Sequence, residues 1–293
     1  MVKDFRDLDI NLINSICNDF EIYRDFNILR QIYPYLDYNI LYSVLFSIGK
    51  YKKELYSKLQ QVNIGDKKIL LISDTHYGSA HDNMKYAHEV FNFAVANGIH
   101  SIFHGGDIIE SEVNAENIFR VKNQAYYFIY NYPHEKSIKT YALLGNHDYS
   151  AININAKVRD TLDSRDDIDI LGFKKIYFKW SDYFISLAHE IDDYKVQLPV
   201  RAEFLSFKGH SHYYHINKKD HGKCERIYIP ALCDDPTPRF SNIPYLKDNS
   251  IIVKPGFLTA EMYNDGIEVV NYSIDDNKII VENEFVKTFK KKK

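Results

Sequence analysis

Between residues 67 and 144 short apolar runs alternate with segments of helical periodicity, and this alternation constrains the fold most. Residues 67–73 and 99–104 are apolar runs with the length of buried strands, and a third such run ends at Leu144. Residues 83–96, which end at an Asn-Gly pair, and residues 114–131 have the spacing of amphipathic helices. The order strand, helix, strand, helix, strand predicts an α/β layered core with right-handed crossovers.

The second half of the chain has a sequence pattern typical of β-hairpins. Alternating apolar residues predict strands at 175–180, 183–188, 226–230, 257–263, 267–274 and 278–286. The first two are expected to pair, and residues 275–277 (Asp-Asp-Asn) are typical of the turn of the last hairpin. A β-α-β-α-β half followed by a strand-rich half predicts two packed sheets flanked by helices.

The N-terminal segment differs from the rest because it has one glycine, Gly49, in its first 62 residues. Its apolar residues recur at helical spacing in two stripes: Leu8, Leu12, Ile16 and Phe20, then Leu41, Leu45, Ile48 and Leu55. Three or four helices are expected, with Pro34 separating two of them because proline cannot continue a helix. We therefore expect a helical segment over residues 1–64 and a larger domain over 65–293.

Composition limits the classes of protein and the compartment. Hydrophobic residues make up 45% and charged residues 26% of the chain, as in ordinary globular proteins. The net charge of −3 gives no general argument for a polyanionic partner. Three cysteines without a CxxC pair argue against a disulfide framework. The N-terminus lacks the apolar core of a signal peptide, and the stretch 40–48 is too short to cross a bilayer. A cytoplasmic location and no membrane association are expected.

Five short polar blocks follow predicted strands. They are Asp74-Thr75-His76, Gly105-Gly106-Asp107, Gly145-Asn146-His147-Asp148, His189, and Gly209-His210-Ser211-His212. In open α/β sheets the loops beyond the carboxyl ends of the strands converge on one crevice, so blocks far apart in sequence are expected to form one site.

The residue types in these blocks suit divalent metals. Carboxylate oxygen and imidazole nitrogen favour Mn, Fe or Zn, and no thiolate is included. A bridging carboxylate, for which Asp107 is the candidate, lets two cations lie about 3.5–4 Å apart, and such a pair generates hydroxide near neutral pH and holds phosphate oxygens. Asn146 offers a neutral amide oxygen. His147 adjoins a ligand and is placed to protonate a departing oxygen, with Glu110 or Asp148 orienting it.

The ordered series DxH…GD…GNHD…H…GHxH resembles the signature of the calcineurin-like metallophosphoesterase superfamily, over roughly residues 67–285. The resemblance implies a four-layer α/β/β/α sandwich and a catalytic histidine, His147. It implies two divalent ions, with Mn favoured and Fe, Zn or Ni as alternatives. One ion would be held by Asp74, His76, Asp107 and His212, and the other by Asp107, Asn146, His189 and His210.

Two features depart from the pattern or match it weakly. Protein Ser/Thr phosphatases of the superfamily carry GDxVDRG, whereas residues 106–112 read Gly-Asp-Ile-Ile-Glu-Ser-Glu, without the phosphate-binding arginine. This disfavours a phosphoprotein phosphatase. The fourth block is a single histidine, and His189 is chosen because it closes an apolar strand about twenty residues before His210.

Substrate choice is expected to depend on the loops 111–135, rich in Tyr and Phe, and 231–256. Arg239 is a candidate for pairing with a phosphate, and Tyr213 for lining the cleft. Aromatic residues stack on bases, although core packing is the commoner role. Residues 33–56 resemble a helix-turn-helix, in which Lys50, Lys52, Lys53 and Lys58 would contact DNA or RNA phosphates. The alternatives for the N-terminal segment are a lid, a dimerisation arm or simple packing on the larger domain.

These features favour a phosphodiesterase or nuclease that acts on nucleic acids or nucleotides. The alternatives are a small-molecule phosphomonoesterase, a cyclic-nucleotide phosphodiesterase, and a metal-binding interaction scaffold with vestigial catalysis. Oligomeric state does not follow from the sequence.

Overall fold

The computed structural model divides the chain into two compact units, one of residues 1–63 with 193–197 and the other of residues 64–192 with 198–293. Each unit is described by itself. The structure describes residues 8–9, 11–13, 15–16, 19, 26–37, 40–41, 44, 65–111, 118–155, 157–173, 175–180, 183–189, 203–217, 225–234, 253–276 and 278–288.

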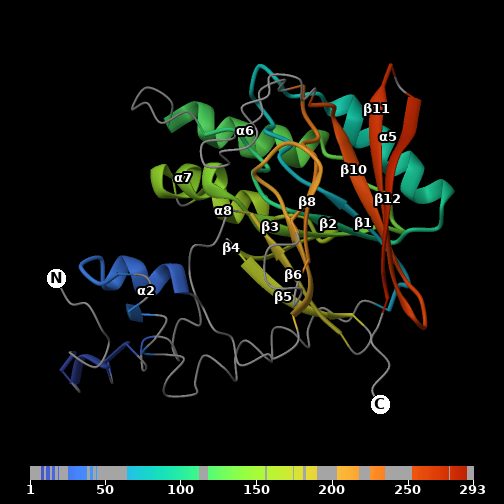
Figure 1. Cartoon of the computed structure of the whole chain (residues 1–293). Helices are drawn as coiled ribbons and strands as arrows, with labels where there is room; N and C mark the ends of the chain where they lie inside the picture. Colours follow the sequence, from blue (N-terminus) through green and yellow to red (C-terminus); the bar gives the residue numbers. More distant parts are fainter. Residues whose placement is uncertain are drawn as a thin grey trace, which may run out of the picture. The chain divides into compact units, whose positions relative to one another are not determined.

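A seven-stranded sheet forms the centre of the larger unit, in the order β12-β11-β10-β1-β2-β3-β4 (Figure 1). Its strands are β1 (Lys68–Ile72), β2 (Ser101–His104), β3 (Lys139–Leu144), β4 (Ile168–Phe173), β10 (Gly256–Met262), β11 (Gly266–Asp275) and β12 (Lys278–Thr288). Strands β1 to β4 are parallel, and β10 to β12 join them as an antiparallel meander. The parallel part corresponds to the strand–helix alternation of the sequence.

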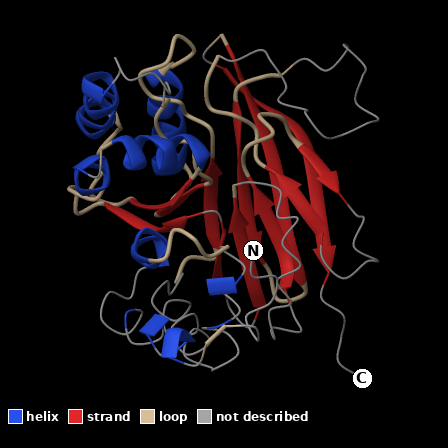
Figure 2. Cartoon of the chain, turned by 90° about the vertical axis from the view of Figure 1, so that its left-hand side faces the viewer, coloured by secondary structure: helices blue, strands red, loops and turns tan. Residues whose placement is uncertain are grey.

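A second sheet of five strands, in the order β5-β6-β7-β9-β8, packs on the first (Figure 2). Its strands are β5 (Lys175–Trp180), β6 (Tyr183–Ala188), β7 (Glu203–Lys208), β8 (His215–Asn217) and β9 (Glu225–Tyr228). Between the sheets, the ring of Phe103 on β2 stacks on Phe178 of β5 with centroids 4.8 Å apart. The predicted hairpin of 175–180 with 183–188 is confirmed, because β5 and β6 pair antiparallel along their full length.

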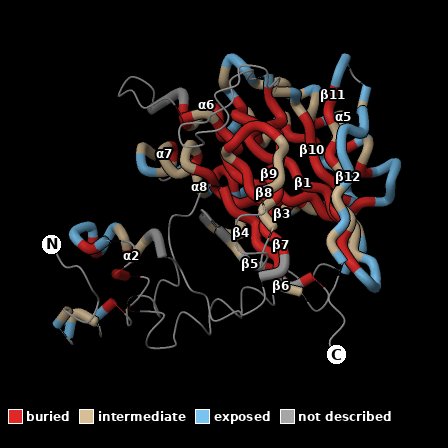
Figure 3. Tube along the Cα trace, in the orientation of Figure 1, coloured by how far each residue is buried: buried red, intermediate tan, exposed pale blue. Residues whose placement is uncertain are grey.

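Four helices of this unit lie on one face of the seven-stranded sheet: α5 (Met84–Ala96), α6 (Ile118–Asn131), α7 (Asn146–Ile154) and α8 (Lys157–Leu162). Their buried side chains share one apolar core with Leu70 and Ile72 of β1. The buried residues of this unit are red in Figure 3. The predicted α/β fold class with two packed sheets and helices is therefore confirmed. The described residues beyond Leu162 form no helix, and the second helical layer of the expected sandwich is not seen among them.

The ends of α5 follow from its sequence. The side chain of Asn83 accepts a hydrogen bond from the backbone N–H of Lys85, which caps the first turn. The helix ends at Ala96 with Asn97 as its C-cap, and Gly98 follows with a φ of +63°, a conformation that favours glycine. The Asn-Gly pair predicted as the stop signal is confirmed as one.

The N-terminal unit has its own small core. Helix α2 spans Phe26–Ile32, and the buried cluster consists of Ile16, Leu29, Tyr33, Leu36, Leu41 and Val44. Helix α2 ends two residues before Pro34, as the sequence predicts. Residues 45–64, which include Lys50, Lys52, Lys53 and Lys58 of the expected nucleic-acid-binding helix, lie outside the described residues. Among the described helices of the chain, none is long and apolar enough to cross a membrane.

Candidate metal centre

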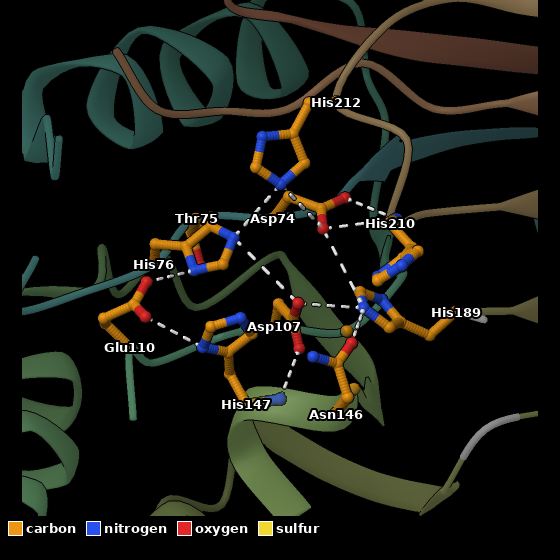
Figure 4. Close-up of polar contacts among 12 residues, drawn as sticks. Asp74, Thr75, His76, Asp107, Glu110, Asn146, His147, His189, His210 and His212 are labelled. Carbon is orange, nitrogen blue, oxygen red and sulfur yellow. Dashed lines mark hydrogen bonds and ion pairs between the residues drawn. The ribbon is translucent and has the colours of Figure 1, made fainter. Parts of the chain in front are cut away.

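The polar blocks predicted from the sequence follow the carboxyl ends of five strands. Asp74 and Asp107 lie just beyond β1 and β2, and Asn146 is the first residue of α7, after β3. His189 follows β6, and His210 follows β7, which runs parallel to β6. Because these ends meet at one edge of the two sheets, the side chains of the blocks come together (Figure 4).

The first group of donors consists of Asp74, His76 and His212. Their ligand atoms lie within 4.8 Å of one another, and all three residues are buried. The Nε2 atoms of His76 and His212 are 3.3 Å apart, and His212 Nε2 is 3.6 Å from a carboxylate oxygen of Asp74.

The second group consists of Asp107, His189 and His210, again with ligand atoms within 4.8 Å of one another. His189 Nε2 lies 2.9 Å from Asp107 Oδ2 and 3.1 Å from Asn146 Oδ1, so the amide oxygen of Asn146 joins this group. The two groups are contiguous, because Asp107 Oδ2 is also 4.0 Å from His76 Nε2. All seven candidate ligands thus surround one buried space.

The turns that carry the ligands have unusual backbone conformations. Asp74, His76, Asp107, His210 and His212 have φ between 44° and 70°, the left-handed region that non-glycine residues rarely adopt. Such outliers concentrate at functional sites, where the surroundings hold them. In Asp74-Thr75-His76 and in His210-Ser211-His212, the first and third side chains thereby both face the space between the donors.

Two glycines of the blocks make room for the donors. A Cβ at Gly145 would lie 2.2 Å from Asp107 Oδ1, and one at Gly106, whose φ is +102°, would lie 2.6 Å from His189 Nδ1. Any side chain at either position would displace a candidate ligand, so the GD and GNHD blocks need their glycines for close approach.

Hydrogen-bond partners set which nitrogen of each imidazole faces the centre. His189 Nδ1 lies 2.8 Å from the carbonyl oxygen of Gly105, which can only accept, so Nδ1 carries the proton and Nε2 faces the donors. Glu110 lies between His76 and His147: its two oxygens are 2.8 Å and 2.9 Å from the respective Nδ1 atoms. Metal-binding histidines are held in this way by a carbonyl or a carboxylate.

The charges in this buried space call for a cation. Burial alone would raise the pKa of Asp74, but the imidazoles of His189 and His212 hold it below its ordinary value. The pKa of Asp107 is likewise depressed, against the effect of burial and chiefly by His189. Burial would lower the pKa of His189, yet Asp107 raises it to about 10. In the metal-free protein a proton on His189 thus balances the carboxylates, and a bound metal ion would take over that role.

Of the two residues expected to orient His147, Glu110 contacts it and Asp148 does not serve that purpose. The buried carboxylate of Asp148 accepts from the backbone N–H groups of Ile108, Ile109 and Gly145, at 2.9–3.1 Å. Burial and the charge of Asp107 raise the pKa of Asp148 to about 6. Asp148 therefore fastens the loop after β2 to the start of α7. Glu110, with a pKa lowered to about 2 by both histidines against the effect of burial, stays ionised.

The structure describes one of the two residues predicted to bind substrate. Arg239 lies outside the described residues. Tyr213 is 6% exposed and its ring stacks on His215, with centroids 4.5 Å apart, so one face of the ring is already covered.

Two polar residues of the donor loops, Thr75 and His104, were not predicted from the sequence to have a role in the site. Both are buried, and Thr75 Oγ1 lies 3.0 Å from His104 Nε2. Thr75 occupies the variable position of DxH, and His104 ends β2. The available signal was the place of a histidine at the end of an otherwise apolar strand, three residues before Asp107.

Comparisons with solved structures found distant likenesses. Vacuolar protein sorting 29 from Cryptosporidium parvum is 15% identical over 75% of this chain and 98% of its own, with a TM-score of 0.42. A predicted phosphoesterase from Streptococcus pneumoniae is 13% identical over 76% and 98%, with a TM-score of 0.41. GAP50 of Plasmodium is 12% identical over 77% and 90%, with a TM-score of 0.48. None of these likenesses bears on activity.

The comparison with curated proteins gave no match. The family model described as calcineurin-like phosphoesterase matches residues 67–251, which include all five polar blocks and both groups of donors. Because this match covers more than half of the chain, the protein belongs to the calcineurin-like phosphoesterase family.

Proposed function

We propose that the chain is a two-metal phosphoester hydrolase that cleaves phosphodiesters of nucleic acids or nucleotides. The observation that carries the proposal is the convergence of seven candidate ligands in two contiguous groups, with His147 and Glu110 beside them (Figure 4). Phosphoryl transfer needs positioning and charge stabilisation more than covalent chemistry, and a pair of cations supplies both.

The donor set fits divalent ions of the Mn, Fe and Zn class. It combines two buried carboxylates with imidazole nitrogens and one amide oxygen, and includes no thiolate. Asp74, His76, Asp107 and His212 would hold one ion, and Asp107, Asn146, His189 and His210 the other, with Mn as the first metal to test. Two ions bound there would polarise the phosphate and lower the pKa of a water molecule between them.

His147 is suited to protonate the leaving group. Its Nδ1 faces the ionised carboxylate of Glu110 at 2.9 Å and therefore carries a proton, while its other nitrogen points toward the centre (Figure 4). A carboxylate behind an imidazole holds the ring in one orientation, so that its far nitrogen can deliver a proton to a departing alkoxide. The side chain of His147 is 15% exposed, so a substrate oxygen can approach it. A scaffold without catalysis would have no need of this pair.

Helix α6 supports a nucleic-acid substrate. Its side chains Val121, Ala125 and Phe128 belong to the core, but Tyr130 is 81% exposed and Tyr126 39% exposed. The two exposed rings are nearly parallel, and Lys122 Nζ lies 5.4 Å from the centroid of Tyr126. Exposed aromatic faces beside a cation are what single-stranded nucleic acids stack on.

The test uses protein loaded with Mn²⁺ on three substrates: bis-p-nitrophenyl phosphate, p-nitrophenyl phosphate and a single-stranded oligonucleotide. We expect hydrolysis of the diester and the oligonucleotide, loss of both in His212→Gln, and wild-type rates in the exposed control His88→Gln. Hydrolysis of the monoester alone would identify a phosphomonoesterase instead. No hydrolysis by the metal-loaded protein would favour an interaction scaffold.

The part of helix α6 in substrate binding has a separate test. Replacing Tyr126 and Tyr130 by serine should raise KM for the oligonucleotide by roughly tenfold, since stacking contributes about 1–3 kcal/mol per base. The same variant should hydrolyse bis-p-nitrophenyl phosphate, which is too small to reach a second contact, at the wild-type rate. An unchanged KM for the oligonucleotide would remove α6 from the substrate-binding surface.

A further inference from the structure

The left-handed turns that carry Asp74, His76 and Asp107 must be held in place by the residues around them. Each such residue costs roughly 1 kcal/mol relative to ordinary backbone conformations, and no glycine relieves that cost at these three positions. Repulsion between the carboxylates of Asp74 and Asp107 adds to the cost when no cation is bound. A support behind the turns would therefore affect how well the site binds metal.

Backbone hydrogen bonds provide part of this support. The loops after β1 and β2 run side by side, with Asp74 N donating to the Gly106 carbonyl at 2.9 Å and His76 N donating to the Asp107 carbonyl at 3.1 Å. These bonds align the two loops along their length. With Tyr77 N donating to the Ile108 carbonyl at 2.9 Å, they hold the carbonyl groups of residues 106–108 and leave the amide of Gly106 to another partner.

Thr75 and His104 complete the support through a chain of hydrogen bonds. The N–H of Gly106 donates to His104 Nδ1 at 3.2 Å, so that nitrogen carries no proton and the proton lies on Nε2. His104 Nε2 then donates to Thr75 Oγ1 at 3.0 Å, and the Thr75 hydroxyl donates to the carbonyl of Ile108 at 2.9 Å.

This chain of hydrogen bonds starts at the amide of Gly106 and ends at the carbonyl of Ile108, so it closes a ring around Asp107. His104 and Thr75 each accept one hydrogen bond and donate another. This fixes the tautomer of His104 and the orientation of the Thr75 hydroxyl. Both ring nitrogens of His104 are engaged, so His104 is not itself available as a metal ligand. His104 is fully buried and Thr75 is 2% exposed, which shields these bonds from water.

We propose that Thr75 and His104 are positioning residues that set the metal affinity of the site by holding the turn of Asp74 and His76 against that of Asp107. The inference rests on the proposed metal centre. It differs from the ordinary role of a buried polar pair, which would affect stability alone. Residues that orient metal ligands typically change metal affinity or activity by about 10–100-fold when they are replaced.

The test compares Thr75→Val, which removes the hydroxyl at nearly constant volume, with Thr75→Ser, which keeps it. The matched control is Thr140→Val: Thr140 is also 2% exposed, and its hydroxyl bonds the buried phenol of Tyr132 at 3.2 Å, at the opposite end of β3 from the donors. Mn²⁺ alone is titrated into each metal-free protein by calorimetry, and the melting temperature is measured in the presence of a chelator.

We expect Thr75→Val to bind Mn²⁺ about 10–100-fold more weakly, Thr75→Ser to recover most of the affinity, and Thr140→Val to lose stability without losing affinity. His104→Asn, which keeps an acceptor for Gly106 but cannot reach Thr75, provides the same test if Thr75→Val does not fold. Its effect should not add to that of Thr75→Val in the double variant, because both break one chain of bonds.

Equal Mn²⁺ affinity in the wild type and in Thr75→Val or His104→Asn would overturn the inference and leave the proposed function intact. A wild-type protein that binds no Mn²⁺, Fe²⁺ or Zn²⁺ would instead refute the metal centre itself. The two failures are therefore distinguishable in the same titration.

Discussion

Replacing Glu110 by glutamine tests how the candidate catalytic histidine and a candidate ligand are held together. Each oxygen of Glu110 now faces one imidazole Nδ1, that of His76 at 2.8 Å and that of His147 at 2.9 Å. Both nitrogens carry protons, because the carboxylate is ionised and can only accept. Glutamine has one acceptor and one NH₂ group, so in either orientation one imidazole N–H loses its acceptor.

The expected loss follows from that count. A hydrogen bond to a charged group contributes about 1.5–3 kcal/mol, and every 1.4 kcal/mol is about a factor of ten. Glu110→Gln should therefore cost roughly 10–150-fold in total. If the NH₂ group of the new glutamine faces His147, the loss should appear in kcat. If it faces His76, the loss should appear in the affinity for Mn²⁺.

The assay measures kcat on bis-p-nitrophenyl phosphate at saturating Mn²⁺, together with the Mn²⁺ dissociation constant. Glu282→Gln is the control, because the carboxylate of Glu282 also accepts from two side chains, Ser273 and Lys254, but on β12. Adding Glu110→Gln to His147→Gln should cost nothing further in kcat at saturating metal, since Glu110 would act on the reaction through His147. If Glu110→Gln stayed within twofold of the wild type in both quantities, the reasoning would be refuted.

Three further predictions concern single residues. Asp107→Asn should lower turnover below detection, because the residue belongs to both proposed ligand sets; turnover near the wild-type rate would exclude it as the bridge. His147→Gln should keep Mn²⁺ binding but lower kcat by about 10²–10⁴-fold, and an unchanged kcat would remove it as the acid. The pKa of Asp167, raised by burial, is brought below its ordinary value by Arg165. Its ion pair with Arg165 should therefore stabilise the fold above about pH 4, by at most about 1 kcal/mol, the upper end for exposed ion pairs. As the pH falls further, the unfolding free energy measured in urea should lose this contribution in the wild type and not in Asp167→Asn.

The fold was predictable where local pattern and tertiary structure agree. Strands at 67–73 and 175–180 and the helix at 83–96 appear within two residues of their expected bounds, because each is an apolar run or stripe ended by polar or turn residues. Helices α7 and α8 were not predicted. The first begins at Asn146, inside a block interpreted as ligands, and the second has only six residues, too few to show a helical period.

Strands β4 and β8 were also not predicted, and the strand expected before Gly209, which is β7, was predicted without bounds. Strand β4 contains Asp169 and Gly172, and both residue types are uncommon in strands. It forms nevertheless, as the parallel partner of β3. Its pairing is a tertiary effect that single-residue propensities do not carry. The three-residue strand β8 exists only through its antiparallel partner β9.

The meeting of the five blocks at one place was predictable from the sequence, and the hydrogen bonds that hold their loops were not. The order of blocks after strands indicated the seven donors, since parallel strands end at one edge. The left-handed conformation of five of them was not foreseeable, because aspartate and histidine do not require it. The hydrogen bond from the backbone of Ile108 to Asp148 and the one between Thr75 and His104 were not foreseeable either. Both depend on which loops become neighbours in space.

The central claim, that two metal ions share this site, is tested most directly by counting them. Metal-free protein loaded with Mn²⁺ and freed of excess should retain two ions per chain, and its electron paramagnetic resonance spectrum should show the coupling of a pair about 3.5–4 Å apart. Asp107→Asn should lose that coupling. One ion per chain in the wild type, two uncoupled ions, or no retained metal would contradict the account.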